Sequence, residues 1–323
     1  MPPSRIYETI DLHTAGEPLR IIVSGLPHIP GTTMLKKQSY FRENFDHVRT
    51  ALMLEPRGHA DMYGCVLTEP VSEGSQFGVV FMHNEGYSTM CGHGIIALTT
   101  VAIMEDWVAD TSSLFWDTRA GTIQARPFLS NGRVEKVFFE SVPSFVLYEK
   151  LSVGGLTVDV AFGGAFYVVV DSPLPIDGNQ LPEIRRLGMK LKNLVESKYQ
   201  VSHPLNPDIK GIYGTVFCGP PANPVLDARN VTIFANGEVD RSPCGTGTCA
   251  VMASRWSRER SVADQTFLHE SIIGTVFEGR IVGTGTVGEF DSIVPEIGGS
   301  AFVTGYNKFQ LDEADPLVSG FRL

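Results

Sequence analysis

The chain lacks any run of about 18 apolar residues, the length that a membrane-spanning helix needs. Its N-terminus, MPPSRIYETID, has no apolar secretory core. Basic residues are scarce, since 26 lysines and arginines stand against 36 aspartates and glutamates, for a formal net charge of −10. These absences predict a cytoplasmic protein and argue against nucleic acid or an anionic membrane as its partner, so a small molecule is the expected one.

Cysteine is also infrequent, with five residues in a chain of 323 and no repeating spacing between them. This odd number fits thiols in a reducing compartment better than a disulfide framework. With 43% hydrophobic and 19% charged residues, the chain is long and apolar enough for two domains with a substantial core.

Hydrophobic periodicity predicts four helices separated by short strands. The helices are expected from about Met34 to Leu54, over Ile95–Met104, over Leu181–Tyr199 and over Ala250–Ser257. The strands are expected at Arg5–Leu12, Leu19–Val23, Met62–Thr68, Gln76–His83, Arg133–Ser141, Thr157–Ala161, Ala165–Val170, Gly211–Phe217 and Ala228–Phe234. Strands, an amphipathic helix, more strands, a glycine turn and an embedded helix occur twice in this order, which predicts two similar lobes.

Two cysteines, Cys91 in MCGHG and Cys244 in SPCGTGT, each open a glycine-rich turn that leads into a predicted helix. A thiol at a helix start is easier to ionise, because the exposed N–H groups and the positive end of the helix dipole favour the thiolate. The two turns therefore predict a matched acid and base in a pocket between the lobes. Cys65, Cys218 and Cys249 lack this setting and are interpreted as packing residues.

Other chemistries fit the thiols less well. Cys91-x-His93 and Cys244-x4-Cys249 lack the two-plus-two ligand spacing of zinc sites. A cysteine hydrolase would leave the second glycine turn without a purpose. A nicotinamide fold needs its glycine motif after an early strand, whereas Gly283–Gly288 comes late, and nothing marks a Schiff-base lysine for pyridoxal phosphate. No metal and no cofactor are expected.

The residues around both thiols, MCGHG at 90–94 and DRSPCGTGT at 240–248, resemble the paired motifs of proline racemases and hydroxyproline epimerases. This family includes trans-3-hydroxy-L-proline dehydratases. HTAGEP at 13–18, EPRGH at 55–59 and FGGAFY at 162–167 are similar to the same family, so the resemblance covers nearly the whole chain.

The resemblance implies the diaminopimelate-epimerase-like fold, an α/β (α+β) architecture of two pseudo-symmetric lobes, each a curved mixed sheet around a central helix. The first lobe is expected over residues 1–145, with Cys91, and is completed by residues 303–323, since the resemblance implies that the last strand, Ala301–Gln310, returns to it. The second is expected over residues 146–302, with Cys244. The implied partner is a small imino acid, proline or a hydroxyproline, and the family's frequent dimers imply a homodimer by analogy.

The implied catalytic residues are Cys91 and Cys244. The residues expected to bind the substrate are Gly92, His93, Asp240, Gly245 and Thr246. Backbone N–H groups at the two helix starts would hold the substrate carboxylate as charge flows onto it. The resemblance implies that Asp240 binds the ammonium nitrogen of the substrate and that His93 lies beside the carboxylate or a ring hydroxyl.

Two observations on function conflict. Dehydratases of this family generally carry threonine at the second thiol position, where this chain has Cys244, yet EPRGHADMYG, HNEGYSTMCGH and VDVAFGGAFY look closer to the dehydratase branch. Inversion at the α-carbon needs a proton-transfer group on each face, and Cys244 supplies the second. The sequence therefore predicts a cofactor-independent racemase or 2-epimerase of proline or a hydroxyproline. The alternatives are a trans-3-hydroxy-L-proline dehydratase with Cys91 as base and, in another class, a non-catalytic imino-acid binding protein.

Overall fold

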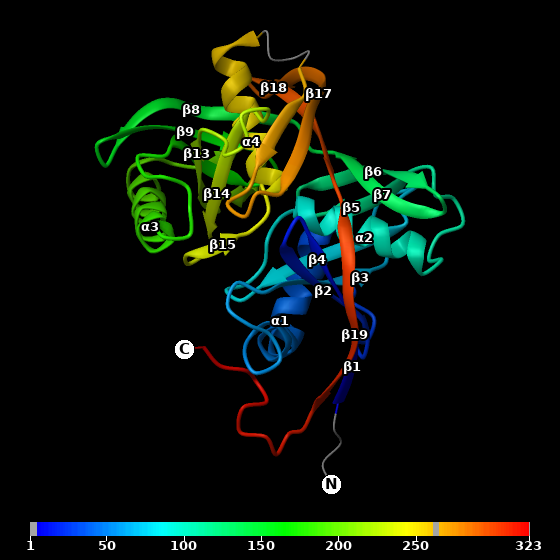
Figure 1. The fold of residues 1–323 in the computed structure, drawn as a ribbon. Coiled ribbons are helices and arrows are strands. Elements are labelled where there is room, and N and C mark those ends of the chain that lie inside the picture. The colour runs from blue at the N-terminus through cyan, green and yellow to red at the C-terminus, as the bar shows by residue number, and fades with distance from the viewer. Residues whose placement is uncertain (1–4, 261–264, 323) are drawn as a thin grey trace. The chain divides into compact units, whose positions relative to one another are not determined.

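The protein is a mixed α/β molecule made mostly of strands (Figure 1). The computed structural model describes residues 5–260 and 265–322. Within them the chain forms two compact units, one of residues 5–89, 94–137 and 300–322, the other of residues 90–93 and 138–299. The mixed α/β class expected from the sequence is confirmed. The expected lobe boundaries at 145 and 302 stay predictions.

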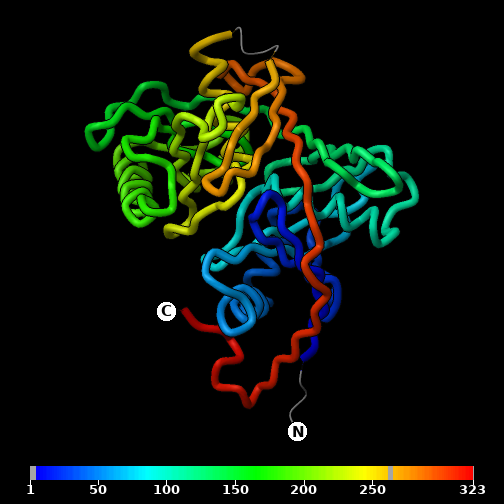
Figure 2. The backbone as a smooth tube through the Cα atoms, viewed as in Figure 1, coloured from blue at the N-terminus to red at the C-terminus, as the bar shows by residue number. Residues whose placement is uncertain are grey.

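The first unit is built on a mixed sheet. Its strands, in the order in which they pair, are β19 (Ala301–Leu311), β1 (Arg5–Thr14), β2 (Glu17–Ser24), β3 (Tyr63–Thr68), β4 (Phe77–His83), β5 (Leu114–Thr118) and β6 (Gly121–Ser130). The β2–β3 and β4–β5 pairs are parallel and the others antiparallel. Figure 2 shows β19 lying along β1, so this unit takes in both ends of the described chain.

Helix α1 (Met34–Met53) packs on β4 through one apolar face. It begins at Thr33, whose side-chain oxygen accepts a hydrogen bond from the Lys36 N–H at 3.2 Å and so satisfies one of the unpaired donors of the first turn. Phe41, Val48 and Leu52 on the buried face are each fully enclosed. This helix was predicted with nearly the same bounds.

Helix α2 (Gly92–Met104) is buried through its first eleven residues. A polar contact fixes it within the first unit, because the Trp116 Nε1–H of β5 donates to Thr99 Oγ1 at 3.0 Å. The prediction of a helix enclosed on all sides is confirmed here. Strand β7 (Arg133–Glu140) follows the sheet strands of this unit in the chain.

Eight strands of the second unit pair in a closed ring. In ring order they are β8 (Ser144–Val153), β9 (Leu156–Phe162), β10 (Phe166–Asp171), β13 (Gly214–Gly219), β14 (Ala228–Phe234), β16 (Phe267–Glu270), β17 (Val276–Val287) and β18 (Phe290–Gly299), and β18 pairs with β8 to close it. The ring leaves its strands paired on both sides. Three short strands lie beside it: β11 (Ser202–His203), β12 (Asn206–Lys210) and β15 (Glu238–Asp240), which pairs with β14.

Two helices complete the second unit. Helix α4 (Gly245–Arg258) packs against β8, β9, β10, β17 and β18 of the ring, and its first ten residues are all buried. Helix α3 (Leu181–Lys198) packs on β13 and β14 with Ile184, Leu191 and Val195 buried along one face. The ring therefore places the N-terminus of α4, and Cys244 just before it, in the interior.

The described residues include no helix that is both long and apolar enough to cross a membrane.

Candidate active site

Cys244 occupies the N-cap of α4 in an unusual backbone conformation. Its φ is 61° and its ψ 106°, a region that residues other than glycine rarely adopt. The cost of such a conformation is about 1–3 kcal/mol, and it persists where the surrounding structure holds it. The side chain is 6% exposed and its Sγ accepts a hydrogen bond from the Gly247 N–H at 3.3 Å. The backbone at Cys244 thus holds the sulfur against the first turn of α4.

Two hydroxyl groups approach the same sulfur. The Tyr167 hydroxyl lies 3.8 Å from Cys244 Sγ, and Thr246 Oγ1 lies 3.9 Å from it. The two hydroxyls are 2.6 Å apart, so one donates to the other. Both side chains are enclosed, with Tyr167 at 0% and Thr246 at 3% exposure. The sulfur therefore accepts from the Gly247 N–H and from one of the two hydroxyls, while the other hydroxyl donates to the first.

Burial nevertheless raises the pKa of the Cys244 thiol well above its ordinary value. The negative charge of Asp240 raises that pKa further, and the Gly247 N–H and the Tyr167 hydroxyl lower it by less. The expectation that the helix start leaves this thiol with a lowered pKa is wrong, because desolvation outweighs the donors. Cys244 is a neutral thiol, the form that can give up a proton.

Asp240 ends β15 and braces the Cys244 turn through one intermediate residue. Its Oδ1 accepts from the Ser242 N–H at 2.8 Å and from the Ser242 hydroxyl at 2.7 Å. The Ser242 hydroxyl in turn accepts from the Cys244 N–H at 3.0 Å. Burial raises the pKa of the Asp240 carboxyl to about 6, although the Ser242 hydrogen bonds oppose the rise. This carboxyl therefore changes charge in the pH range just below neutrality.

A second brace holds the Pro243 carbonyl, one residue before Cys244. Asn230 Nδ2 and Thr248 Oγ1 both donate to that oxygen, at 2.7 and 2.9 Å. The ring of His269, fully buried on β16, lies 2.9 Å from each of these donors. Burial lowers the pKa of His269 to about 3, so the ring is neutral and can donate to one neighbour and accept from the other.

The first cysteine lies immediately before α2. Cys91 is 4% exposed, and its Sγ lies 3.2 Å from Nδ1 of His93, which is also 4% exposed. A thiol beside an imidazole can pass its proton to the ring, which turns the sulfur into a base. The structure thus pairs two of the predicted site residues, Cys91 and His93.

The two glycine-rich turns touch each other. Residues 90–93 group with the second unit, and a Cβ added to Gly92 would lie 2.7 Å from the Gly245 Cα. A Cβ on Gly245 would meet the Gly92 Cα at the same distance. Glycine is required at both positions because any side chain would push the turns apart. The backbone therefore brings the segments that carry Cys91 and Cys244 together.

Sequence reasoning missed several residues of this arrangement. Tyr167 ended the FGGAFY segment, which was noted for its resemblance without a role, and Ser242 stood inside the second thiol motif. No local pattern marked Asn230 or His269, since they come from separate strands and contact each other only in the folded chain. The expected donation by the backbone N–H groups of the two helix starts stays a prediction.

The other cysteines do not join the site. Cys65 and Cys249 are fully buried in the two cores, as expected for packing residues, and Cys218 is half-buried on β13. Burial raises the pKa of Cys249 to about 12, so it is a poor nucleophile. Among the described residues, no group of three or more histidines, cysteines, aspartates or glutamates is placed to hold a metal ion.

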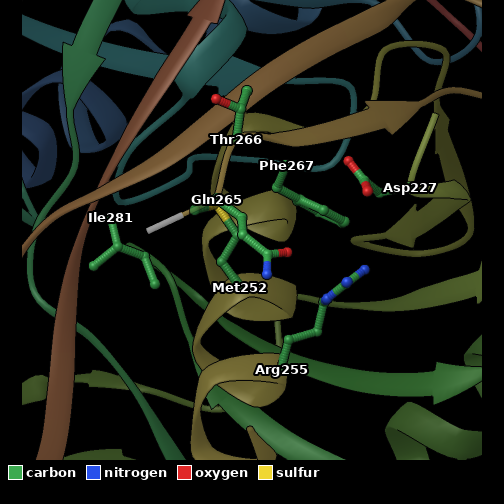
Figure 3. Close-up of a pocket in the computed structure, with 7 residues that line it drawn as sticks. All are labelled: Asp227, Met252, Arg255, Gln265, Thr266, Phe267 and Ile281. Carbon is green, nitrogen blue, oxygen red and sulfur yellow. The ribbon is translucent and has the colours of Figure 1, made fainter. Parts of the chain in front are cut away.

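A separate pocket opens on the second unit, and no cysteine lines it (Figure 3). Met252 and Arg255 reach it from α4, and the Arg255 guanidinium lies 4.5 Å from the centre of the Phe267 ring. The remaining lining residues are Asp227, Gln265, Thr266 and Ile281. None of the predicted site residues lines it, so this pocket is not part of the candidate active site.

The family model described as "Proline racemase" matches residues 9–322. The chain is 46% identical to a trans-3-hydroxy-L-proline dehydratase of Bacillus cereus, with 100% of each chain covered, and 43% identical to a 3-hydroxyproline 2-epimerase of Burkholderia multivorans, with 99% of each covered. The solved structure of a hydroxyproline epimerase from Agrobacterium vitis, with bound trans-4-hydroxy-L-proline, matches with a TM-score of 0.90 and 30% identity over 99% of this chain and 96% of that one.

The chain belongs to the proline racemase family, as its motifs indicated. It is an enzyme of that family, and its fold is the one found in the family's solved structures. The relatives include both dehydratases and epimerases, so membership by itself leaves the reaction open.

Proposed function

We propose that this enzyme dehydrates trans-3-hydroxy-L-proline, with Cys91 as the base that removes the α-hydrogen. The observation that carries the proposal is the 46% identity, over the full length of both chains, with a protein named for that reaction. From the sequence, this reaction is the alternative to inversion. The contact between Cys91 and His93 gives it a chemical basis.

The stereochemistry of the substrate places both reacting groups on one face of the ring. In trans-3-hydroxy-L-proline the hydroxyl and the carboxylate lie on opposite faces, so the α-hydrogen and the 3-hydroxyl share a face. A base and an acid on that same face therefore suffice for elimination. Cys91 Sγ and His93 Nδ1, 3.2 Å apart, are such a pair.

The reaction balances with these groups. The Cys91 thiolate takes the α-hydrogen as a proton, and the electron pair of that C–H bond forms the Cα–Cβ double bond as the C3–O bond breaks. The departing hydroxyl takes a proton from the imidazolium of His93 and leaves as water. The enamine then takes a proton at C3 and loses one from nitrogen to give pyrroline-2-carboxylate, and no oxidant is needed.

The remaining predicted residues hold the substrate in this mechanism. Backbone N–H groups of Gly92, His93, Gly245 and Thr246 bind the carboxylate, where negative charge grows as the α-hydrogen leaves. The Asp240 carboxylate binds the ammonium group. Its pKa of about 6 lets it ionise at neutral pH in spite of its burial.

A second candidate is 2-epimerisation of the same substrate, and Cys244 is the observation that favours it. A neutral thiol on the opposite face can return a proton to the α-carbon before the hydroxyl leaves, which inverts the centre. The 43% identity with a 3-hydroxyproline 2-epimerase supports this candidate as well. The same deprotonated substrate can follow either course.

Proton NMR in deuterated water with trans-3-hydroxy-L-proline tests the proposal. We expect pyrroline-2-carboxylate as the main product, and we expect Cys91→Ser to lower the rate at least 100-fold, because the base is lost. Cys244→Thr should raise the ratio of dehydration to epimerisation at least tenfold, since the second proton donor is gone.

Cys249→Ala is the matched control, because Cys249 lies on the same helix and does not join the site. It should give the wild-type products in the wild-type ratio. If the wild type forms the 2-epimer and no pyrroline-2-carboxylate, dehydration is rejected in favour of the second candidate. Inversion of proline or 4-hydroxyproline with no reaction of the 3-hydroxy compound would reject both.

A further inference from the structure

The hydroxyl of Tyr167 has no role in the proposed mechanism, yet it lies in the interior at the reactive end of Cys244. Tyr167 projects from β10, is 0% exposed, and has its hydroxyl 3.8 Å from Cys244 Sγ and 2.6 Å from Thr246 Oγ1. A hydroxyl buried this completely stabilises the fold only if its hydrogen bonds are satisfied. Its partners here are a reacting atom and the side chain next to it.

We propose that Tyr167 is a positioning residue that, together with Thr246, stabilises the Cys244 thiolate and thereby sets how much substrate is inverted rather than dehydrated. The effect on the two products rests on the proposed function. The effect on the Cys244 thiolate does not, because it follows from the contact between the Tyr167 hydroxyl and the sulfur.

The chemistry follows from what Cys244 becomes when it acts. As it protonates the α-carbon, its S–H bond breaks, a C–H bond forms from the electron pair of the carbanion, and the S–H electron pair stays on sulfur. The product is a buried thiolate, which is costly unless donors surround it. The donors within reach are the Gly247 N–H and the Tyr167 hydroxyl, and the Thr246 hydroxyl can donate to the Tyr167 oxygen and so leave the phenol proton for the sulfur.

Tyr167 suits this role because it stays protonated. Burial raises the pKa of its phenol well above the ordinary value, and the neighbouring Cys244 raises it further. The phenol therefore keeps its proton and donates it as a hydrogen bond when the sulfur becomes negative. Its ring is also fixed, since it meets the Tyr213 ring edge-on, with the centroids 5.8 Å apart at 89°.

Tyr167→Phe tests the inference by removing one oxygen and keeping the ring. The first readout is alkylation of Cys244 by iodoacetamide, followed for each cysteine by peptide mass spectrometry at several pH values. Loss of the donor should slow alkylation of Cys244 about tenfold at a given pH, a shift of about one pH unit in its profile. Alkylation of Cys91 in the same samples should change less than twofold.

The second readout is the product ratio from trans-3-hydroxy-L-proline in deuterated water. In Tyr167→Phe, the 2-epimer should fall about tenfold relative to pyrroline-2-carboxylate, because the thiolate that inversion produces has lost a donor. A loss of packing would lower both products together. The ratio therefore separates a role at the sulfur from a structural one.

Tyr213→Phe is the matched control, because it removes the same atom from the neighbouring ring. It should leave both the alkylation rate and the product ratio at wild-type values. If Tyr167→Phe does not fold, Thr246→Val removes the other hydroxyl and should shift both readouts in the same direction.

Unchanged alkylation of Cys244 in Tyr167→Phe, or an equal change in Tyr213→Phe, overturns the role of Tyr167. So does slower alkylation without a change in the product ratio, because the thiolate would then not govern inversion. If the wild type gives neither product, the proposed function fails, and the alkylation profile still decides whether Tyr167 stabilises the Cys244 thiolate.

Discussion

At the scale of one residue, the helix start and the surroundings of Cys244 shift the pKa of its thiol in opposite directions. The helix start supplies the Gly247 N–H, which favours the thiolate, as the sequence motif indicated. Burial and the charge of Asp240 act the other way and raise the thiol's pKa. The motif predicted the wrong direction for the pKa of this thiol, because desolvation depends on the strands that enclose it.

Asp240 gives a prediction about pH. Burial raises the pKa of its carboxyl to about 6, so the group is protonated below that pH. If the substrate ammonium pairs with the ionised form, binding should weaken about tenfold for each pH unit below about 6. Calorimetric titration of proline into the Cys91→Ser variant, which cannot turn it over, measures this dependence.

Asp240→Asn is the comparison for this titration. It should bind more weakly than the parent at pH 7 and lose the dependence on pH, since the amide does not ionise. Affinity that stays flat between pH 5 and pH 8 in the parent would show that Asp240 does not bind the ammonium. The same carboxyl affects the stability of the fold in the opposite direction with pH. Its contribution to the free energy of unfolding is fully present below the unfolded pKa of 3.8 and is lost as the pH rises through about 6.

The helices were predicted well at the scale of elements, and several strands were missed. Helices α1, α2 and α3 lie within a few residues of their expected bounds, because apolar positions at helical spacing mark them locally. The missed strands include β17, whose spaced glycines at 283–288 were considered only as a nicotinamide-binding motif and set aside. Its regularity comes from the antiparallel pairing with β18, which no pattern within β17 itself encodes.

Gly163 gives a prediction about how the first turn of α4 packs. It lies between β9 and β10, and a Cβ there would stand 2.3 Å from the Thr246 carbonyl oxygen and 2.6 Å from the Ala250 nitrogen. These are backbone atoms of α4 and cannot rotate away. Gly163→Ala should therefore lower the free energy of unfolding by about 1–3 kcal/mol, as overpacking does in other cores, and displace the helix start.

Urea unfolding measures this effect, with Gly178→Ala as the matched control. Gly178 lies in the same unit and has nothing within 4 Å of the added atom. The control should unfold within about 0.5 kcal/mol of the wild type. Equal unfolding free energies for the two variants would mean that α4 can shift to make room at Gly163.

At the scale of the whole molecule, the last strand of the chain, β19, completes the sheet of the first unit. β19 pairs with β1 over the full length of β1, from Arg5 opposite Leu311 to Thr14 opposite Ala301. Arg20 of β2 lies under this pair, with its guanidinium 4.3 Å from the centre of the Phe309 ring. The two ends of the described chain thus form one edge of the same sheet.

Truncation tests how much the first unit depends on that strand. A chain that ends at Gly299 leaves β1 as an exposed edge and uncovers the apolar residues beneath Phe309, so it should aggregate or lose its cooperative unfolding transition. A chain that ends at Leu311 keeps β19 and should remain folded. Circular dichroism and size-exclusion chromatography compare the two, and a monomeric, cooperatively folded 1–299 chain would contradict the prediction.

The sequence by itself determined the family, the helices, and the position of a cysteine directly before each of two helices, α2 and α4. These features depend on residues close together in the chain. The charge of the Cys244 thiol, the hydroxyl of Tyr167 beside it and the His269 brace behind it were decided by the tertiary structure alone. They depend on residues of β10, β14 and β16, which come from distant parts of the chain and contact Cys244 or its neighbours Pro243 and Thr248. The free energy of a buried charge is set by everything that replaces water around it.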